Sequence, residues 1–461
     1  MSIYLFLLVV LSLTCGSLPA SDVAAWRSVT ASIGLVLGWT ILCHVTAGAM
    51  AGQVRRERIP WSTGMRWLQL QLDILRWLGL PVTLICLGLF RLAPMVVAAP
   101  VLEHSLMLQS VVLLMPGIIV LMATWSAEHC FGIKLGLTEK GIDGWSRSML
   151  RAFRAGPAWL LGPTLVFMAL GDVLSFAVTW GWFELPTLDA VGLREPILWI
   201  AGILVGLVVV WFLPRAITWL IKTEPIYPEQ LRQLEQWLHA VGISTHPVWG
   251  TAPIRWNTSH RSLNAMIAGL IPWGRRLLIS DRILDELPTN QLMMVIMHEV
   301  AHAKRFHVPL RMLSMLPAWF ASAFLSEWLV RNGWMPESWG PIIGGVGGLC
   351  VTIGLLGLIA YATEIDADST ACRLAVKAMQ QSFDATSSGQ DETSFLRLAR
   401  ASMRDALIRV TAGHPASRRA SWLHPSLEMR LRWLGQNTNT NSFQFNTASA
   451  ASIRARGAET P

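Results

Sequence analysis

Two histidines four residues apart, His298 and His302, are the side chains of this sequence that most clearly indicate chemistry. Pro288 and Thr289 predict a helix start upstream of them. Positions i and i+4 of a helix differ by only about 40° around its axis, so both imidazoles project from one face and could hold one zinc ion. Glu299, one residue beyond the first histidine, would face a water at that ion, which suits a general base.

A zinc ion that performs hydrolysis needs a third protein ligand, and a fourth position stays open for water. Glu364 is the best candidate, because two apolar runs separate it from His302 and return the chain to the same side of a membrane. Asp368 lies one helical turn further, where it could accept the outer N–H of a ligating histidine. Asp366 points about 200° away from Glu364 and is expected to face solvent.

The same residues also allow a simpler interpretation, in which a polar helix face carries hydrogen-bonded histidines and no metal. A five-residue match of this kind arises by chance in about one chain in a hundred of this composition. His307 lies about 140° around the helix from His302, which favours local support of the site over a fourth metal ligand. The later glutamate therefore carries much of the weight of the zinc hypothesis.

Membrane helices must position these side chains, because the composition is too apolar for a soluble protein of this length. Of 461 residues, 53% are hydrophobic and 14% charged, and the mean hydropathy is +0.45. A bilayer core of about 30 Å needs an apolar run of about 20 residues. Such runs lie at about 3–18, 29–50, 77–101, 106–127, 157–180, 197–221, 309–330 and 341–361. The first is either a cleaved signal peptide or a retained anchor.

The charge distribution predicts the orientation of these runs. The net charge is +8, yet the basic residues gather in the loops after the second and fourth runs instead of on one face, which argues against a nucleic-acid partner. The positive-inside rule places both loops in the cytoplasm, together with the histidine motif after the sixth run. Asp172, inside the fifth run, is either a buried acid that lines a chamber or the mark of a helix break.

We therefore expect a mainly α fold, with polytopic membrane helices and a cytoplasmic α+β catalytic domain. Helical spacing over 229–241 and short apolar segments at 264–271 and 275–280 predict a helix and two strands in that domain. The expected parts are a membrane domain of about six helices at 1–222, a first catalytic part at 223–308, a membrane hairpin at 309–361, a second catalytic part at 362–435 and a disordered tail at 436–461.

Taken together, these motifs resemble the HtpX and CAAX-prenyl-protease family of integral-membrane zinc metallopeptidases, whose catalytic domain is a zincin-like fold of the gluzincin type. The resemblance covers about 231–434. It rests on the following motifs: His298-Glu-Val-Ala-His302 with Lys304, Arg305 and His307; Glu364-x-x-x-Asp368 after a membrane hairpin; Asn264-Ala265 before the segment Arg276-Leu-Leu-Ile-Ser-Asp281; and His424-Pro-Ser426 with Arg430.

This resemblance implies one Zn²⁺ per subunit, bound by His298, His302 and Glu364, with Glu299 as the base. It further implies that His424 and Arg430 lie at the active site, where the histidine would bond the oxyanion and the arginine would position it or the substrate. The strand that begins at Asn264 and Ala265 would hold an extended peptide by edge addition. On their own, His424-Pro-Ser could be a helix start, Arg430 a surface residue and Asn264 a turn residue.

The expected function is that of a zinc-dependent endopeptidase in a bacterial-type cell membrane, with its active site on the cytoplasmic side. Its partners would be the lipid bilayer and a membrane-associated peptide or protein substrate, in quality control or processing. Two alternatives stay open, namely a receptor metallopeptidase of the type that senses beta-lactams, and a non-catalytic membrane scaffold with a degenerate motif. Six runs precede the motif, more than an HtpX-like protease carries.

Overall fold

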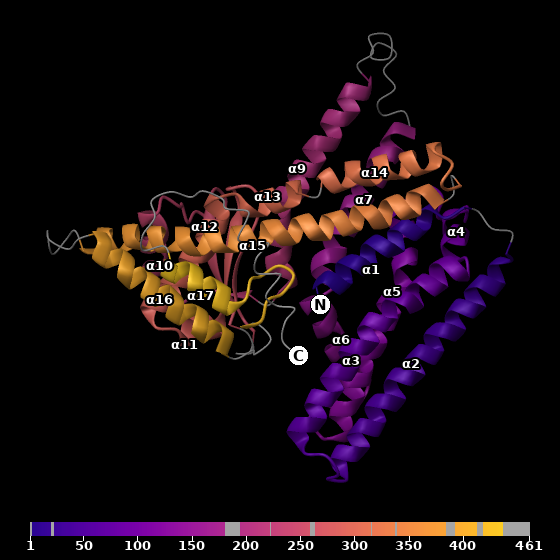
Figure 1. Cartoon of the computed structure of the whole chain (residues 1–461), viewed down its shortest axis with the longest axis horizontal. Helices are drawn as coiled ribbons and strands as arrows, with labels where there is room; N and C mark the ends of the chain where they lie inside the picture. The colour runs from indigo at the N-terminus through magenta and orange to yellow at the C-terminus, as the bar shows by residue number, and fades with distance from the viewer. Residues whose placement is uncertain are drawn as a thin grey trace.

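Long helices form most of the chain, and the strands of a small sheet lie near the middle of the sequence (Figure 1). The structure is a computed structural model. It describes residues 2–19, 23–179, 194–221, 223–258, 263–314, 316–336, 339–383, 392–412 and 418–436. The expected tail lies outside the described residues beyond residue 436, and so do residues 20–22, which follow the first apolar run.

The regular elements of the N-terminal half are all helices within the described residues. Helices α2, α3 and α5 pack lengthwise against one another, and α1 and α7 pack against α5. A hydrophobic cluster that includes Cys43, Leu72 and Val120 fills the space between the first three. The elements are α1 (Ser2–Thr14), α2 (Ala25–Arg55), α3 (Trp61–Leu84), α4 (Leu92–Val97), α5 (Leu106–Lys134), α6 (Ile142–Ala155), α7 (Ala158–Thr179) and α9 (Arg194–Leu220).

The third predicted membrane run, residues 77–101, differs from the observed helix. Helix α3 begins at Trp61, sixteen residues earlier, and continues through one π-helical turn to Leu89. Arg91 then adopts a left-handed conformation with φ 60°, which separates α3 from the short helix α4. The early start follows from Leu68 and Leu72, which are buried at helical spacing although charged residues interrupt their segment.

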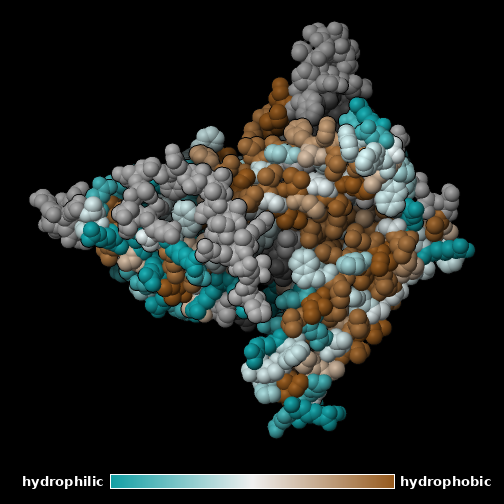
Figure 2. Space-filling view, viewed as in Figure 1, coloured by the Kyte–Doolittle hydropathy of each residue, from teal (hydrophilic) through white to brown (hydrophobic). Residues whose placement is uncertain are grey.

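Within the described residues, five helices are long and apolar enough to cross a membrane by length and composition. They are Ala25–Arg55, Trp61–Leu89, Leu106–Lys134, Gly202–Trp219 and Ile343–Gln381. Figure 2 shows hydrophobic side chains along the faces of the long helices and hydrophilic ones at the tip where α2 and α3 join. The chain is thus a multi-pass membrane protein with a mainly α fold, as the composition predicts.

The sheet has four strands in the order β1-β2-β4-β3. Strands β1 (Thr223–Glu224), β2 (Thr251–Trp256), β3 (Ala265–Ala268) and β4 (Arg275–Ser280) follow one another in the chain, and β2 runs parallel to β4. The sequence did not predict β2, because Pro253 lacks an N–H for a sheet. In the structure the two residues of β1 pair with Arg255 and Trp256 of β2. Pro253 therefore lies beyond the end of β1, where the β1 side of β2 has no paired strand.

Helix α15 connects the membrane part of the chain with the sheet-containing domain. It is a single helix of 44 residues, and it packs against α14 at one end and against α12 and α16 at the other. The remaining helices are α10 (Pro228–Ala240), α11 (Asp281–Glu286), α12 (Thr289–Lys304), α13 (His307–Leu313), α14 (Leu316–Arg331), α15 (Gly340–Phe383), α16 (Glu392–Ala412) and α17 (Leu427–Gln436).

Small side chains set the distance between α12 and α15. Ala367, Ala371 and Ala375 recur every four residues on one face of α15, and each is fully buried. Val300 and Ala301 of α12 are equally buried in the same hydrophobic core. Because alanine adds little bulk, the two helix backbones can approach closely, and polar residues next to this contact are brought within reach of each other.

Asp172 has a structural role that neither interpretation of the sequence foresaw. Helix α7 continues through it, so the helix-break interpretation is wrong. Its carboxylate accepts hydrogen bonds from the Ser105 hydroxyl at 2.6 Å and from the backbone N–H groups of Leu106 and Met107 at 2.6 and 3.0 Å. Asp172 thereby caps the first turn of α5, whose N–H groups have no partner within their own helix.

We predict that Asp172→Ala lowers the free energy of unfolding by about 1 to 3 kcal/mol, because buried N–H groups lose their acceptor. The measurement is the thermal unfolding midpoint of the full chain in detergent. Asp73→Ala is the control, since its carboxylate is 64% exposed and pairs only with nearby Arg76. Equal midpoints for the two variants would show that the cap contributes nothing.

Candidate metal centre and active site

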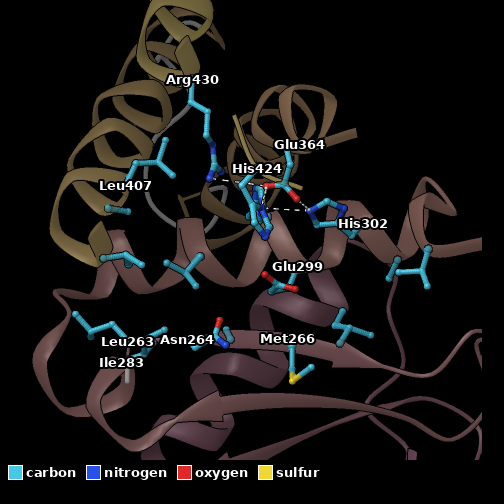
Figure 3. Close-up of a pocket in the computed structure, with 18 of the residues that line it drawn as sticks. Leu263, Asn264, Met266, Ile283, Glu299, His302, Glu364, Leu407, His424 and Arg430 are labelled. Atoms are coloured by element: carbon cyan, nitrogen blue, oxygen red, sulfur yellow. Dashed lines mark hydrogen bonds and ion pairs between the residues drawn. The ribbon is translucent and has the colours of Figure 1, made fainter. Parts of the chain in front are cut away.

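Three donor atoms from two helices meet at one point. His298 and His302 belong to α12, and Glu364 belongs to α15; Figure 3 labels His302 and Glu364. The two Nε2 atoms lie 3.2 Å apart, and the Glu364 carboxylate oxygens lie 3.6 Å from His298 Nε2 and 3.5 Å from His302 Nε2. The continuous helix α15 carries Glu364 from the membrane segment directly to this point.

This triangle has the dimensions of a zinc site. A tetrahedral ion about 2.0 to 2.1 Å from each ligand needs donor atoms about 3.3 Å apart. The two Nε2 atoms lie 3.2 Å apart, and each lies 3.5 or 3.6 Å from a different oxygen of the Glu364 carboxylate, which is close to that value. Two imidazole nitrogens that face each other across a carboxylate can both be satisfied by a shared cation, so the residues fit a metal.

Asp368 and Arg430 fix the orientation of the first histidine. His298 Nδ1 lies 3.0 Å from Asp368 Oδ1, an ion-pair distance at which the carboxylate favours a proton on Nδ1 and leaves Nε2 for the metal position. Arg430, from α17, donates two hydrogen bonds of 2.7 and 2.6 Å to the same carboxylate. The structure thus brings the predicted Asp368 to the histidine, and it joins Arg430 to Asp368.

The second histidine is oriented from the opposite side. His302 Nδ1 lies 2.9 Å from His307 Nδ1, and His307 Nε2 lies 3.0 Å from Asp366 Oδ2. If Asp366 accepts the His307 Nε2 proton, His307 Nδ1 accepts from His302 Nδ1, and the His302 Nε2 lone pair points to the metal position. Phe306, with φ 51°, makes the turn after α12 that aims His307 back at His302.

The expectation that Asp366 faces solvent is wrong. Its side chain is 22% exposed and is held between His307 and Arg305, whose Nε donates to it at 3.0 Å. The helical wheel placed Asp366 correctly relative to Glu364. It could not show that the turn at Phe306 covers that side of α15 with two cationic or proton-donating groups.

Arg311 is a site residue that the sequence analysis missed. It lies on α13, and its Nη2 donates to Glu364 Oε1 at 3.0 Å and to the Thr363 hydroxyl at 2.6 Å. These bonds hold the Glu364 carboxylate in place through Oε1, the oxygen that also lies nearest to His302. The available signal was an arginine inside a predicted apolar run, where a charge normally has a specific partner.

The protonation of the histidines follows from their surroundings. Burial lowers the pKa of His302 to about 2, which keeps it neutral as a metal ligand must be. Burial also opposes a charge on His298, but the carboxylates of Asp368 and Glu364 outweigh it and raise its pKa to about 9. A cation that binds here must therefore displace a proton from His298.

Glu299 lines the same pocket with its carboxylate directed toward the strands (Figure 3). Burial raises its pKa to about 7, although the nearby His298 and a hydrogen bond from the Ile267 backbone act in the opposite direction. A carboxyl whose pKa lies near neutrality can accept a proton and return it within one reaction cycle.

The pocket is a cavity of about 750 Å³ between α12, α16 and strand β3. His424 lines it, with Nδ1 3.4 Å from Glu364 Oε2 and 60% of its side chain exposed. Asn264 and Ala265 form the opposite wall, about the start of β3 (Figure 3 labels Asn264). All the site residues predicted from sequence thus surround this pocket or support its ligands.

Strand β3 presents an open edge to the pocket. Among the described strands it pairs with β4 alone, and the Ser280 N–H donates to the Asn264 carbonyl at 2.9 Å. Along an antiparallel strand, the backbone N–H and C=O groups of successive residues point alternately toward the paired strand and away from it. Asn264 points toward β4, so the backbone groups of Ala265 and Ile267 point to the free edge of β3. The Ile267 backbone forms a hydrogen bond with the Glu299 side chain at that edge.

Residues 230–436 match the family model of Peptidase family M48. This region, called the M48 domain below, is similar to the peptidases of that family. The match confirms the resemblance inferred from the zinc motif at the level of the family, and with it a metallopeptidase domain in a membrane protein. The solved structure of S. mikatae Ste24p is similar with a TM-score of 0.48 and 16% identity, over 90% of this chain and 100% of that one. None of the curated proteins compared with the chain matches it significantly.

We predict that Asp366→Asn in the M48 domain weakens zinc binding about 10- to 100-fold, because His307 loses the charge that fixes its proton. Competition with a chelator measures the affinity for zinc independently of any activity. Asp405→Asn removes an exposed charge from α16 and should bind zinc like the wild type. An unchanged affinity for Asp366→Asn would contradict a role for the His307 and Asp366 pair.

Proposed function

We propose that the chain is an integral-membrane zinc-dependent endopeptidase, with one zinc ion per chain. The convergence of His298 Nε2, His302 Nε2 and Glu364 beside the carboxylate of Glu299 carries this proposal. Two histidines and one carboxylate can also hold non-haem iron. The neighbouring Glu299, placed for proton transfer, and the match to a peptidase family favour zinc and hydrolysis.

When bound, zinc supplies Lewis-acid chemistry to water and to the scissile carbonyl. Glu299 takes the proton of the attacking water and later delivers it to the leaving amine. The pKa of about 7 suits both transfers, because neither form of the carboxyl is strongly favoured at neutral pH. The hydrogen bond from Ile267 holds the carboxylate between α12 and β3, next to a peptide on the strand edge.

His424 is the residue best placed to stabilise negative charge on the carbonyl oxygen. It lies at the pocket beside Glu364, and its exposed imidazole can donate one N–H to a bound substrate. Arg430 lines the pocket, 3.8 Å from Glu364, so a role in positioning the oxyanion or the substrate stays a prediction. Both of its short hydrogen bonds go to Asp368, so we infer that it positions His298 through that carboxylate.

The substrate would bind as an extended strand along β3. The free backbone groups of Ala265 and Ile267 offer a ladder of hydrogen bonds without regard to side-chain type. Apolar residues line the cavity on either side, among them Met266, Leu263 and Leu407, and they favour apolar substrate side chains. Such segments occur in membrane-associated proteins, which fits a role in membrane protein processing or quality control.

The cytoplasmic side of a bacterial-type cell membrane is the proposed location of the active site. Arg55, Arg56 and Arg58 are exposed where α2 joins α3, and Arg147 and Arg151 are exposed on α6. A concentration of exposed arginines at these connections is what the positive-inside rule associates with the cytoplasm.

We predict that Glu299→Gln abolishes peptide cleavage and leaves zinc bound, because the amide can neither accept nor return the proton. Hydrolysis of a denatured membrane protein and the metal content of the purified chain are measured together. Glu392→Gln, at the exposed first residue of α16 and not among the pocket-lining residues, is the matched control and should retain full activity. A Glu299→Gln variant with wild-type turnover would overturn the proposed mechanism.

The role of the strand edge is tested with Ala265→Pro, which removes an outward N–H and keeps the bonds to β4. Loss of one substrate hydrogen bond of about 1 to 1.5 kcal/mol should lower kcat/KM about tenfold, with zinc content unchanged. Ala265→Ser keeps the N–H and should behave like the wild type. Identical kcat/KM values for the proline and serine variants would exclude edge addition at this residue.

A further inference from the structure

Two arginines without a carboxylate partner meet where α9 reaches the sheet. Arg215 lies on α9 and Arg276 on β4, outside the metal centre. Figure 1 shows α9 running from the top of the view down toward α13, and its residues contact β3 and β4. Among the described residues, no salt bridge joins either guanidinium to an acid. Arg255 of the same sheet, by contrast, pairs with Asp285.

The geometry of the sheet leaves Arg276 without a possible ion-pair partner beside it. Its neighbours in register are Ala252 on β2 and Ala268 on β3. Both neighbours carry only a methyl side chain, so neither supplies a negative charge. Arg276 also points to the face of the sheet opposite Arg275, which lines the peptidase pocket.

Arg215 is fixed in position from two directions. Its guanidinium lies 4.1 Å from the centre of the Trp211 ring, one turn earlier on α9. A Cβ at Gly274 would lie 3.1 Å from Arg215 Nη1, so the turn before β4 passes close to the guanidinium. Gly274 has φ 73°, a conformation that favours glycine, and this turn leads directly into Arg276.

The two positive charges are close enough to disfavour each other. Burial lowers the pKa of Arg276, and the charge of Arg215 lowers it further. Arg215 Nη1 and Arg276 Nε are buried without a hydrogen-bond partner in the described structure, while both side chains as a whole are half-buried and present other N–H groups outward. An anion between them would offset the repulsion and the lost hydration.

The position along α9 indicates which anion is available. The candidate membrane span Gly202–Trp219 ends one turn after Arg215. Trp219 and Trp273 are 89% and 56% exposed on either side of the cluster, as tryptophans at the headgroup level of a bilayer are. An arginine near the end of a membrane helix extends its guanidinium to that level, where phosphates are abundant.

We propose that Arg215 and Arg276 bind the phosphate of an anionic phospholipid headgroup. Two guanidiniums suit this ligand, because each can donate paired N–H groups to phosphate oxygens. The lipid would lie against the turn between β3 and β4 and tie the sheet to the membrane surface. This site is independent of the proposed peptidase activity, since neither residue contacts the metal ligands or the pocket.

Binding is measured on the detergent-purified full chain by native mass spectrometry with three probes: short-chain phosphatidylglycerol, short-chain phosphatidylcholine and inorganic phosphate. The wild type should bind one phosphatidylglycerol at least about tenfold more tightly than the Arg215→Gln, Arg276→Gln double variant. The reason is that the double variant loses at least one hydrogen bond from a charged donor to the phosphate. Zinc content verifies that both proteins are folded. Arg276→Gln alone, which leaves α9 unchanged, should show the same loss in weaker form.

The matched control is Arg404→Gln with Arg409→Gln, which removes two exposed charges from α16 and should bind phosphatidylglycerol like the wild type. Phosphatidylcholine that binds the wild type as tightly as phosphatidylglycerol would overturn the requirement for an anionic headgroup. Inorganic phosphate that competes fully at equal concentration would overturn the lipid in favour of a free anion. Equal binding by the wild type and both Arg276 variants would overturn the site itself.

Discussion

The close contact between α12 and α15 is the constraint on which the site depends. The buried alanines at 367, 371 and 375 let the α15 backbone approach Val300 and Ala301 of α12. Glu364 can reach two imidazoles of α12 only at this distance, because its side chain has few atoms to extend. A larger residue at any of these alanines would separate the helices and the three donor atoms with them.

The hydrogen bonds around the ligands explain how so many polar groups are buried at one point. Each imidazole has a carboxylate beyond it, Asp368 for His298 and Asp366 through His307 for His302. Each of these carboxylates is in turn paired with an arginine. Charges that are fully paired and hydrogen-bonded tolerate burial, whereas a single unpaired one would be costly. The ligands are therefore oriented before any metal arrives.

The sequence predicted the parts of this arrangement that depend on spacing along one helix or across one hairpin. His298 and His302 share a helix face, and the two runs before Glu364 return it to the same side, so their convergence was foreseeable. The environment of Asp366 was not, because it depends on the turn at Phe306. Arg311 was hidden inside an apolar run, and β2 was hidden by Pro253, whose tolerance depends on how far β1 extends. Contacts set by tertiary packing leave no periodic signal in a sequence.

The membrane part and the M48 domain meet along two helices with different tasks. Helix α15 carries a metal ligand out of the bilayer, and α9 ends beside a sheet whose outer strand faces the pocket. The central claim is that His298, His302 and Glu364 together bind one zinc ion. X-ray absorption of the chain loaded with one equivalent of zinc tests it most directly. We predict two imidazole nitrogens and a carboxylate oxygen at about 2.0 to 2.2 Å, with the carboxylate lost in Glu364→Ala. Sulfur ligands, or a spectrum unchanged by that substitution, would contradict the account.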